Sequence, residues 1–384
     1  MIEHADHSHS TESGVTIQPH RVAHNPLGVR GIDHIEFFVD NAQAWAQYYV
    51  ARFGLYLRAV GKPETGLEGR ISYVVGQGRV IFVFTQACGE SPIAQQIREH
   101  FQKHGCGVKD LAFRVKDAQA ALKSATLAGA EVADEFSECA NDGHVDFRSA
   151  AIKTYGDTIH SFIERPRHGR FAPGYENAAS GIEEGDISFA MLDHIVANVE
   201  HMDEWVEFYH RVFGFDQTAH FDINTGRSAL MSKVVGDEDG YIKLPINEPS
   251  SRNSQIQEFL DEYHGPGIQH IALLTPNIIS TVREMRAQGV QFMTVPDSYY
   301  DAEFRARVGQ IKEDIADLQR HGILVDRDRP DGYLLQIFTH PIFGRPTLFH
   351  EVIQRRGNSD GFGEGNFKAL FEAIEREQAK RGTL

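Results

Sequence analysis

Short apolar runs alternate with amphipathic segments along this chain, and the same order of segments occurs twice. Residues 31–39 are an apolar run that predicts a buried strand, and residues 42–53 carry aromatic side chains on one side and stop at Gly54, which predicts a helix. In the second half, residues 191–199 predict a strand and residues 202–213 predict a helix that again stops at a glycine. The pattern therefore favours two similar halves.

A fixed offset of 160 residues relates the two halves. At this offset His34 aligns with His194, and Gly129, which is expected to end a helix, aligns with Gly289. Self-similarity at one fixed spacing is the signature of an internal duplication. We therefore predict an α+β protein with two tandem duplicated domains, each built of two strand-helix-strand-strand-strand (βαβββ) modules.

Composition changes mark the limits of the domains. Residues 1–30 are polar, carry several histidines and have no apolar period, so we expect a flexible, solvated arm rather than a metal-binding tail. Residues 31–165 form the first predicted domain, and residues 166–186, which are rich in glycine, proline and charge, form the linker. Residues 187–384 form the second predicted domain.

Two segments of the second half have no counterpart in the first. One is an insertion near residues 296–329, predicted to be mostly a helix over residues 300–319. The other is residues 366–378, where apolar side chains at helical spacing predict an amphipathic helix that must be buried somewhere. The glycines of residues 361–365 before it can act as a hinge or form a tight turn, and the sequence leaves both open.

The chain is acidic, with 38 basic and 54 acidic residues and a formal net charge of -16. An acidic surface disfavours nucleic acid and anionic membranes as partners. The three cysteines, Cys88, Cys106 and Cys139, are too irregularly spaced for a disulfide framework or a thiolate zinc site. Because no apolar run is long enough for a membrane helix, we expect a soluble, cytoplasmic protein, and its acidity is compatible with a homodimer or homotetramer.

Three residues with metal-binding chemistry lie inside apolar strands of the second half, namely His194, His270 and Glu351. A lone buried histidine is more often a core residue than a ligand. The duplication provides an internal comparison, because the first half has Asp110 where the second has His270, and Ser161 where it has Glu351. We therefore interpret the second half as carrying a site of which the first half retains a relic.

A buried carboxylate needs a nearby cation, and a metal ion would provide one. Two imidazoles and one carboxylate suit a non-haem Fe(II) oxygenase, because an octahedral ion then keeps three positions for a bidentate 2-oxo acid and O2. A zinc hydrolase can use the same ligands but usually keeps a single open position for water. The ligand set therefore favours oxygen chemistry.

The second half also contains a series of specific motifs. They lie at residues 244–249, 254–257, 267–272, 322–326, 334–338, 345–347, 351–355 and 361–367. In this order they resemble the 4-hydroxyphenylpyruvate dioxygenase family of the vicinal oxygen chelate superfamily. The resemblance covers the whole second half and, more loosely, the first.

The resemblance implies a vicinal oxygen chelate fold, Fe(II) held by His194, His270 and Glu351, and conversion of 4-hydroxyphenylpyruvate and O2 to homogentisate and CO2 in tyrosine catabolism. It also implies that the C-terminal helix is a lid over the site. The residues that it implies for catalysis are Ser228, Asn247, Gln269 and Gln336. Those that it implies for substrate binding are Pro245, Gln255, Phe338, Phe349, Phe362, Asn366 and Phe367.

Two other functions stay open at this point. A 4-hydroxymandelate synthase uses the same substrate and metal but hydroxylates the benzylic carbon, whereas the pattern of Pro245, Asn247 and Phe338 resembles that of ring-hydroxylating enzymes. A non-catalytic binding protein on the same duplicated fold would keep a cleft but no metal. The three intact ligands argue against that second alternative.

Overall fold

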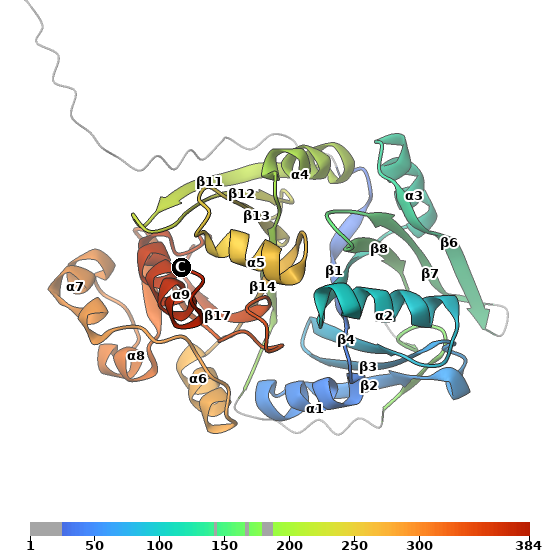
Figure 1. The fold of residues 1–384 in the computed structure, drawn as a ribbon, viewed down its shortest axis with the longest axis horizontal. Coiled ribbons are helices and arrows are strands. Elements are labelled where there is room, and N and C mark those ends of the chain that lie inside the picture. The colour runs from blue at the N-terminus through green and yellow to red at the C-terminus, as the bar shows by residue number, and fades with distance from the viewer. Residues whose placement is uncertain (1–24, 142–143, 166–168, 179–186) are drawn as a thin grey trace, which may run out of the picture.

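The computed structural model describes residues 25–141, 144–165, 169–178 and 187–384 (Figure 1). The expected N-terminal arm lies outside the described residues up to position 24, as does much of the expected linker. In the described part of the chain, no helix is long and apolar enough to cross a membrane.

The first domain is built on a mixed, nine-stranded sheet with helices packed against it (Figure 1). Its strands lie in the order β6-β7-β8-β5-β1-β4-β3-β2-β9. The elements along the chain are β1 (Val29–Phe38), α1 (Ala42–Phe53), β2 (Tyr56–Gly61), η1 (Pro63–Thr65), β3 (Arg70–Gln77), β4 (Val80–Ala87), α2 (Pro92–His104), β5 (Gly107–Val115), α3 (Ala118–Leu127), β6 (Val132–Asn141), β7 (His144–Lys153), β8 (Ile159–Glu164) and β9 (Tyr175–Asn177).

The second domain is built on a mixed, eight-stranded sheet in the order β11-β12-β13-β10-β14-β17-β16-β15. Its elements are β10 (Met191–Asn198), α4 (Met202–Phe208), η2 (Tyr209–Phe213), β11 (Asp216–Asn224), β12 (Ala229–Gly236), β13 (Lys243–Pro249), α5 (Gln255–Tyr263), β14 (Gly267–Leu274), α6 (Ile278–Ala287), η3 (Asp297–Tyr300), α7 (Ala302–Val308), α8 (Ile315–His321), β15 (Leu324–Arg329), β16 (Gly332–Phe338), β17 (Phe349–Arg356), η4 (Glu364–Asn366) and α9 (Phe367–Arg381).

The predicted duplication and the α+β fold of paired modules are confirmed. Strands β1 to β8 of the first sheet correspond in chain order to β10 to β17 of the second. Read from β2 to β6, the first sheet then has the same order as the second sheet read from β11 to β15, and β9 is the one strand added at its edge. Helices α3 and α6 begin and end at the predicted offset. Gly129 and Gly289, which follow these helices, both have a φ of +87°, in the left-handed region that favours glycine.

Two domain limits differ from those expected. Strand β1 begins at Val29, two residues before the expected start of the domain, and pairs there with Val115 of β5. Within the expected linker, residues 175–177 form β9 and pair with β2, so this part of the segment extends the first sheet. Edge pairing of so short a strand depends on its partner rather than on its own sequence.

The insertion is not the single helix expected over residues 300–319. It forms η3, α7 and α8 instead. Gly309, with a φ of +67°, ends α7, and the side chains of Asp301 and Asp314 start α7 and α8 by accepting hydrogen bonds from their first backbone N–H groups. The helix expected over residues 202–213 is present, but its last turn, η2, is a π-helix.

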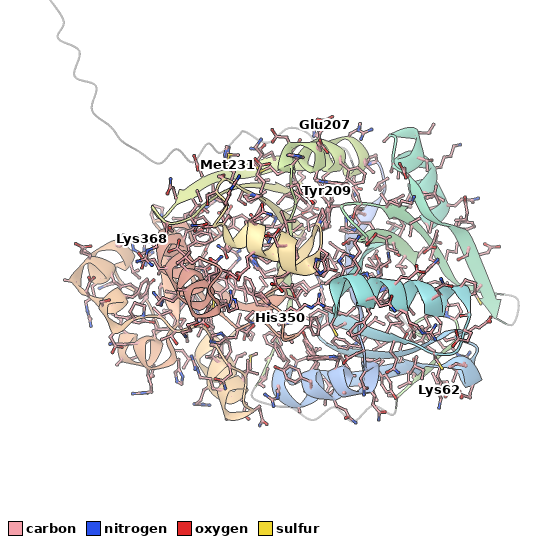
Figure 2. The ribbon with its side chains drawn as sticks, viewed as in Figure 1. Lys62, Glu207, Tyr209, Met231, His350 and Lys368 are labelled. Carbon is pink, nitrogen blue, oxygen red and sulfur yellow. The ribbon has the colours of Figure 1, made fainter. Side chains whose placement is uncertain are left out.

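One large apolar core runs through both domains. At the boundary Phe113 of the first domain lies 5.2 Å from Phe213 of the second, and Trp45 lies 4.7 Å from Phe343, measured between ring centroids. His350, from β17, lies in the same region between the two sheets (Figure 2). The two domains therefore share a core instead of meeting through a polar interface.

A smaller apolar cluster lies within the second domain. It joins α5 to α9 through Phe259, Leu370 and Phe371, and it includes Phe338 and Phe349 from the sheet. The predicted amphipathic C-terminal helix is thus confirmed, with its apolar side packed over one face of the second sheet (Figure 1).

Candidate metal centre

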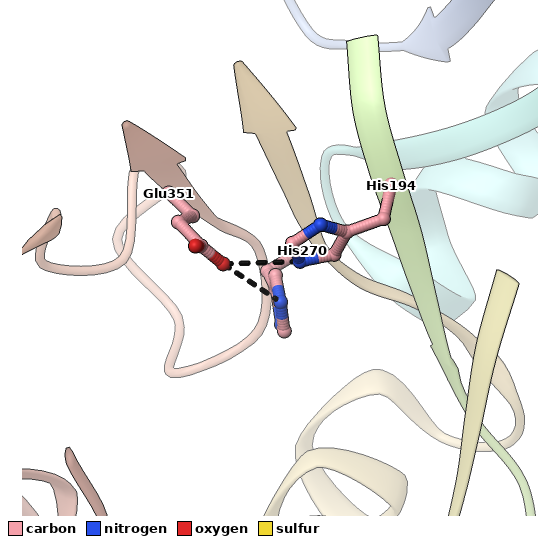
Figure 3. A group of neighbouring side chains, drawn as sticks. All are labelled: His194, His270 and Glu351. Atoms are coloured by element: carbon pink, nitrogen blue, oxygen red, sulfur yellow. Dashed lines mark ion pairs between the residues drawn. The ribbon is translucent and has the colours of Figure 1, made fainter. Parts of the chain in front are cut away.

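The sheet register brings the three predicted ligands together in the second domain. His194 of β10 and Glu351 of β17 both lie opposite Ala272 of β14, one on each side. His270 lies two residues before Ala272, and residues two apart on a strand share one face. The three side chains therefore converge from three neighbouring strands (Figure 3).

The potential ligand atoms are close enough to share one ion. Glu351 Oε2 lies 3.0 Å from His194 Nε2 and 3.7 Å from His270 Nε2 (Figure 3). One ligand atom from each residue lies within 4.8 Å of the others. Among the residues that the structure describes, no other group of three His, Cys, Asp or Glu side chains has this geometry.

Burial makes a cation the natural partner of these groups. His194 and Glu351 are only 3% and 2% exposed. Glu351 Oε1 and His270 Nδ1 are buried without a hydrogen-bond partner among the described residues. Because a buried carboxylate oxygen without a partner is costly, a metal ion fits this donor set.

A second layer of charges orients His194. Its Nδ1 donates to Asp193 Oδ1 at 2.8 Å, and Arg355 donates to both oxygens of that carboxylate at 2.7 Å. Although Asp193 is buried, Arg355 and His194 hold its pKa well below the usual range. Burial lowers the pKa of His194, but the carboxylates of Glu351 and Asp193 outweigh this effect and raise the pKa above its usual value. The bond at Nδ1 leaves Nε2 facing Glu351, which is the arrangement that a metal-binding imidazole needs.

His270, unlike His194, has no carboxylate hydrogen-bonded to its Nδ1 atom among the described residues. Burial, together with His194 and His350, holds its pKa well below the usual range. Its ring is therefore neutral, and a metal ligand must be unprotonated at the binding nitrogen.

The first domain keeps the scaffold of this site and His34, the counterpart of His194, but has Asp110 and Ser161 in place of the other two candidate ligands. His34 donates to Asp33 at 2.8 Å, and Arg165 binds that carboxylate, as Arg355 does in the second domain. Asp110 accepts a hydrogen bond from the backbone N–H of Ser161 at 3.0 Å, and burial raises its pKa to about 6. This half matches the relic that the duplication predicted.

A cavity of about 70 Å³ adjoins the three ligands. Eight of the other predicted site residues line it, and they are Pro245, Asn247, Gln255, Gln269, Phe338, Phe349, Phe362 and Phe367. The lining is mostly apolar with a few neutral amides, which suits an aromatic ligand that carries a polar group. Helix α9 closes one side through Leu370, Phe371 and Ile374.

Ser228 was expected in the site, but it does not line this cavity. It precedes β12, and its hydroxyl donates to the buried carboxylate of Glu375 on α9 at 2.7 Å. Ser232 lines the cavity instead and lies directly opposite Asn247 in the pairing of β12 with β13. No local signal in the sequence indicated Ser232, because its place in the cavity follows from this pairing, in which cross-strand neighbours project to the same face.

Gln336 and Asn366 were also expected in the site, and neither lines the cavity. Gln336 shares a strand face with Phe338, and its buried amide atoms have no hydrogen-bond partner among the described residues. Asn366 is fully buried and accepts a hydrogen bond from the Tyr299 hydroxyl at 2.6 Å. The Gln336 amide lies under Gly363, and Asn366 is the last residue of the short turn η4 that precedes α9, so neither side chain lies against the cavity.

The glycine segment before α9 is held in place at several points. The Gly361 carbonyl accepts a hydrogen bond from Arg355 at 2.7 Å, and its N–H donates to Asp328 at 2.7 Å. Gly365 N–H donates to Asp326 at 2.9 Å. Gly363 has a φ of +79°, in the left-handed region that favours glycine, and a side chain there would also displace the Gln336 amide.

Comparison with known proteins agrees with this geometry. Residues 23–172 match the family model described as the N-terminal part of hydroxyphenylpyruvate dioxygenase, and residues 191–337 match the model of the glyoxalase, bleomycin resistance protein and dioxygenase superfamily. A solved structure of a mutant 4-hydroxymandelate synthase from Streptomyces coelicolor is similar, with a TM-score of 0.80, 31% identity, and coverage of 91% of this chain and 99% of that one.

Curated relatives extend the similarity over nearly the whole chain. The 4-hydroxyphenylpyruvate dioxygenase of Neurospora crassa is 43% identical, covering 92% of this chain and 93% of its own. The enzymes of that name from Yarrowia lipolytica and Danio rerio are also 43% identical, covering 92% and 91% of this chain and 94% and 91% of their own. The chain therefore belongs to the 4-hydroxyphenylpyruvate dioxygenase family.

Proposed function

We propose that this protein is a non-haem Fe(II) dioxygenase that converts 4-hydroxyphenylpyruvate and O2 to homogentisate and CO2. The observation that carries the proposal is the convergence of His194, His270 and Glu351 beside an aromatic-lined cavity, in a chain of this family. The test is anaerobic reconstitution with Fe(II), followed by addition of substrate and O2, measurement of O2 uptake and identification of the aromatic product. Uptake of O2 with formation of homogentisate supports the proposal, and a metal-loaded protein without uptake contradicts it.

The protein contributes binding, orientation and exclusion of water. Bound at the three ligands, Fe(II) would supply the site for the 2-oxo acid of the substrate and the electrons that activate O2. Phe338 and Phe367 line the cavity on the sheet and on α9, where they can hold the phenol ring between them. The side chains of Asn247 and Gln255 offer neutral hydrogen bonds to the ring hydroxyl without adding charge.

The size of the cavity indicates that the site must open. Its volume of about 70 Å³ is well below the roughly 300 Å³ at the lower end of ligand pockets. Helix α9 and its aromatic side chains, together with the start of α5 and Phe362, form the wall that is not part of the sheet. We therefore propose that α9 is a lid, which moves to admit substrate and then closes over it.

Phenylpyruvate, which lacks the ring hydroxyl, tests how the cavity recognises the phenol. Without that hydroxyl, the buried amides of Asn247 and Gln255 lose a partner, at a cost of about 1 to 3 kcal/mol. We expect kcat/KM for phenylpyruvate to be lower by roughly one to two orders of magnitude. Equal kcat/KM for the two substrates would mean that these residues do not bind the hydroxyl.

Asp193, whose carboxylate orients His194, offers a further test, and Asp33 of the first domain provides the control. In Asp193→Asn we expect the Kd for Fe(II) to rise by about 10- to 100-fold, because the layer of residues behind a metal ligand tunes its affinity to this extent. Asp33→Asn changes the equivalent residue beside His34 in the first domain and should leave this Kd unchanged. Anaerobic metal titration of both variants gives the comparison, and equal Kd values for the two would contradict the assignment.

Product identity separates the proposal from 4-hydroxymandelate synthase. The similar solved structure shows that the same architecture serves a protein of that name. Pro245, Asn247 and Phe338, the pattern associated with ring hydroxylation, all line the cavity, which supports homogentisate as the product. Formation of 4-hydroxymandelate would select the alternative.

Location and assembly complete the proposal. We propose a cytoplasmic protein that forms a homodimer or homotetramer, on the basis of its acidic composition. Light scattering of the purified protein tests the assembly directly.

A further inference from the structure

The two domains are linked by a reciprocal pair of buried hydrogen bonds. The hydroxyl of Tyr49, on α1, lies 2.6 Å from His350 Nε2 in the second domain. The hydroxyl of Tyr209, in the equivalent helix of the second domain, lies 2.7 Å from His160 Nε2 in the first. All four residues are almost completely buried. Each domain thus donates one tyrosine hydroxyl to a strand of the other sheet, Tyr49 to β17 and Tyr209 to β8.

Backbone carbonyls fix the direction of both bonds. His350 Nδ1 lies 3.3 Å from the Ile271 carbonyl oxygen, and His160 Nδ1 lies 3.0 Å from that of Leu111. A carbonyl can only accept, so Nδ1 carries the proton in both rings and Nε2 accepts from the tyrosine hydroxyl. The two links are therefore equivalent in geometry and in chemistry.

The links differ in what lies next to them. His350 directly precedes Glu351 on β17, and Ile271 directly follows His270 on β14. Successive side chains on a strand point to opposite faces, so His350 faces the first domain while Glu351 faces the cavity. The hydrogen bonds from Tyr49 to His350 and from His350 to Ile271 join β17 to β14 on the face opposite the cavity. These two strands carry Glu351 and His270, two of the three proposed ligands.

The backbone of His350 is fixed as well. Its N–H donates to Thr339 Oγ1 at 2.9 Å, and its carbonyl accepts from the Thr339 N–H at 2.8 Å. In the first domain, the equivalent link through His160 lies behind Asp110 and Ser161, where no group of three potential metal ligands converges among the described residues. Loss of the Tyr49 hydrogen bond should therefore affect the proposed metal centre, whereas loss of the Tyr209 hydrogen bond should not.

We propose that Tyr49 is a positioning residue for the metal centre of the other domain. Its hydroxyl holds His350, and through it the backbones of β17 and β14, so that Glu351 and His270 meet at one ion. Metal sites require ligand placement to within about 0.5 Å, and such placement depends on the residues behind the ligands. The inference rests on the proposed metal site, and it gives the first domain a role in that site although it supplies no ligand.

The test compares Tyr49→Phe with Tyr209→Phe. Each change removes one hydroxyl from the same domain boundary and keeps the ring. We expect both variants to show a lower Tm, and Tyr49→Phe alone to show about a 10-fold higher Kd for Fe(II) in anaerobic titration.

A double variant separates positioning from stability. In Tyr49→Phe with His350→Phe, both hydrogen-bonding partners become apolar rings, so no buried nitrogen is left unpaired and the Tm should recover. The Kd for Fe(II) should stay raised, because the link to Ile271 is also gone. This variant keeps the test valid if Tyr49→Phe alone folds poorly.

Two results would overturn the inference. One is an unchanged Kd in Tyr49→Phe, and the other is an equal rise in Tyr49→Phe and Tyr209→Phe, which would make both links purely structural. Failure of the unaltered protein to bind Fe(II) is a separate result, because it would overturn the proposed function itself.

Discussion

Glu351→Gln is expected to abolish turnover and to raise the Kd for Fe(II) by more than about 100-fold, beyond the effect of changing a residue behind a ligand. The carboxylate is buried, its Oε1 has no hydrogen-bond partner in the described part of the chain, and its Oε2 faces both histidines. Glutamine keeps the shape of the side chain and removes the charge. His194→Ala and His270→Ala should have the same consequence, because each removes one of the three donors.

Thermal unfolding gives a measure of this loss that does not depend on activity. Fe(II) at about 100 times its Kd should stabilise the unaltered protein by about 2.7 kcal/mol, and Glu351→Gln should lose this increment. Asp110→Ala and Ser161→Ala, at the equivalent positions of the first domain, serve as controls and should keep it. Stoichiometric iron and normal turnover in folded Glu351→Gln would contradict the assignment of the ligands.

Deletion of the chain from Gly361 onward is expected to leave Fe(II) binding intact and to lower kcat by about 100-fold, the size of effect that loss of substrate positioning produces. The deletion removes Phe362, Phe367 and the wall that α9 contributes, while the three ligands lie on the sheet. Water would then reach the reacting groups, so O2 uptake should exceed the homogentisate formed.

A smaller change tests the same lid without exposing the apolar cluster beneath it. Arg381, near the end of α9, donates to the carboxylate of Glu258 on α5 at 2.8 to 3.0 Å. Arg381→Ala should weaken the attachment of α9 to α5. We expect a higher KM, or less homogentisate formed per O2 consumed (looser coupling), with Fe(II) binding unchanged. If the truncated protein keeps its kcat, KM and coupling, α9 is structural only and the lid proposal is wrong.

The sequence predicted the fold, and it singled out the three residues that the structure brings together, because both follow from the duplication. Aligned positions of the two halves fold alike, so a residue that changes chemistry between them, such as His270 against Asp110, marks a difference in function and not in packing. The pairing of both His194 and Glu351 with Ala272 then places the trio on one face. Local patterns sufficed here since each strand is long and clearly apolar.

Other features depended on tertiary contacts that a local pattern does not contain. Ser228 and Ser232 lie four residues apart, and only the pairing of β12 with β13 places Ser232 in the cavity. Strand β9 exists because β2 offers an open edge. The register shifts of β10 against β14 show why counting residues alone does not fix which side chains face the site.

The most direct test of the dioxygenase assignment uses isotopically labelled O2 with the Fe(II)-loaded protein and 4-hydroxyphenylpyruvate. The account predicts that both atoms of one O2 molecule appear in homogentisate, one in the new ring hydroxyl and one in the carboxylate left after loss of unlabelled CO2. Label in the benzylic hydroxyl of 4-hydroxymandelate would contradict the assigned product. Absence of label from every aromatic product would contradict oxygen chemistry at this site altogether.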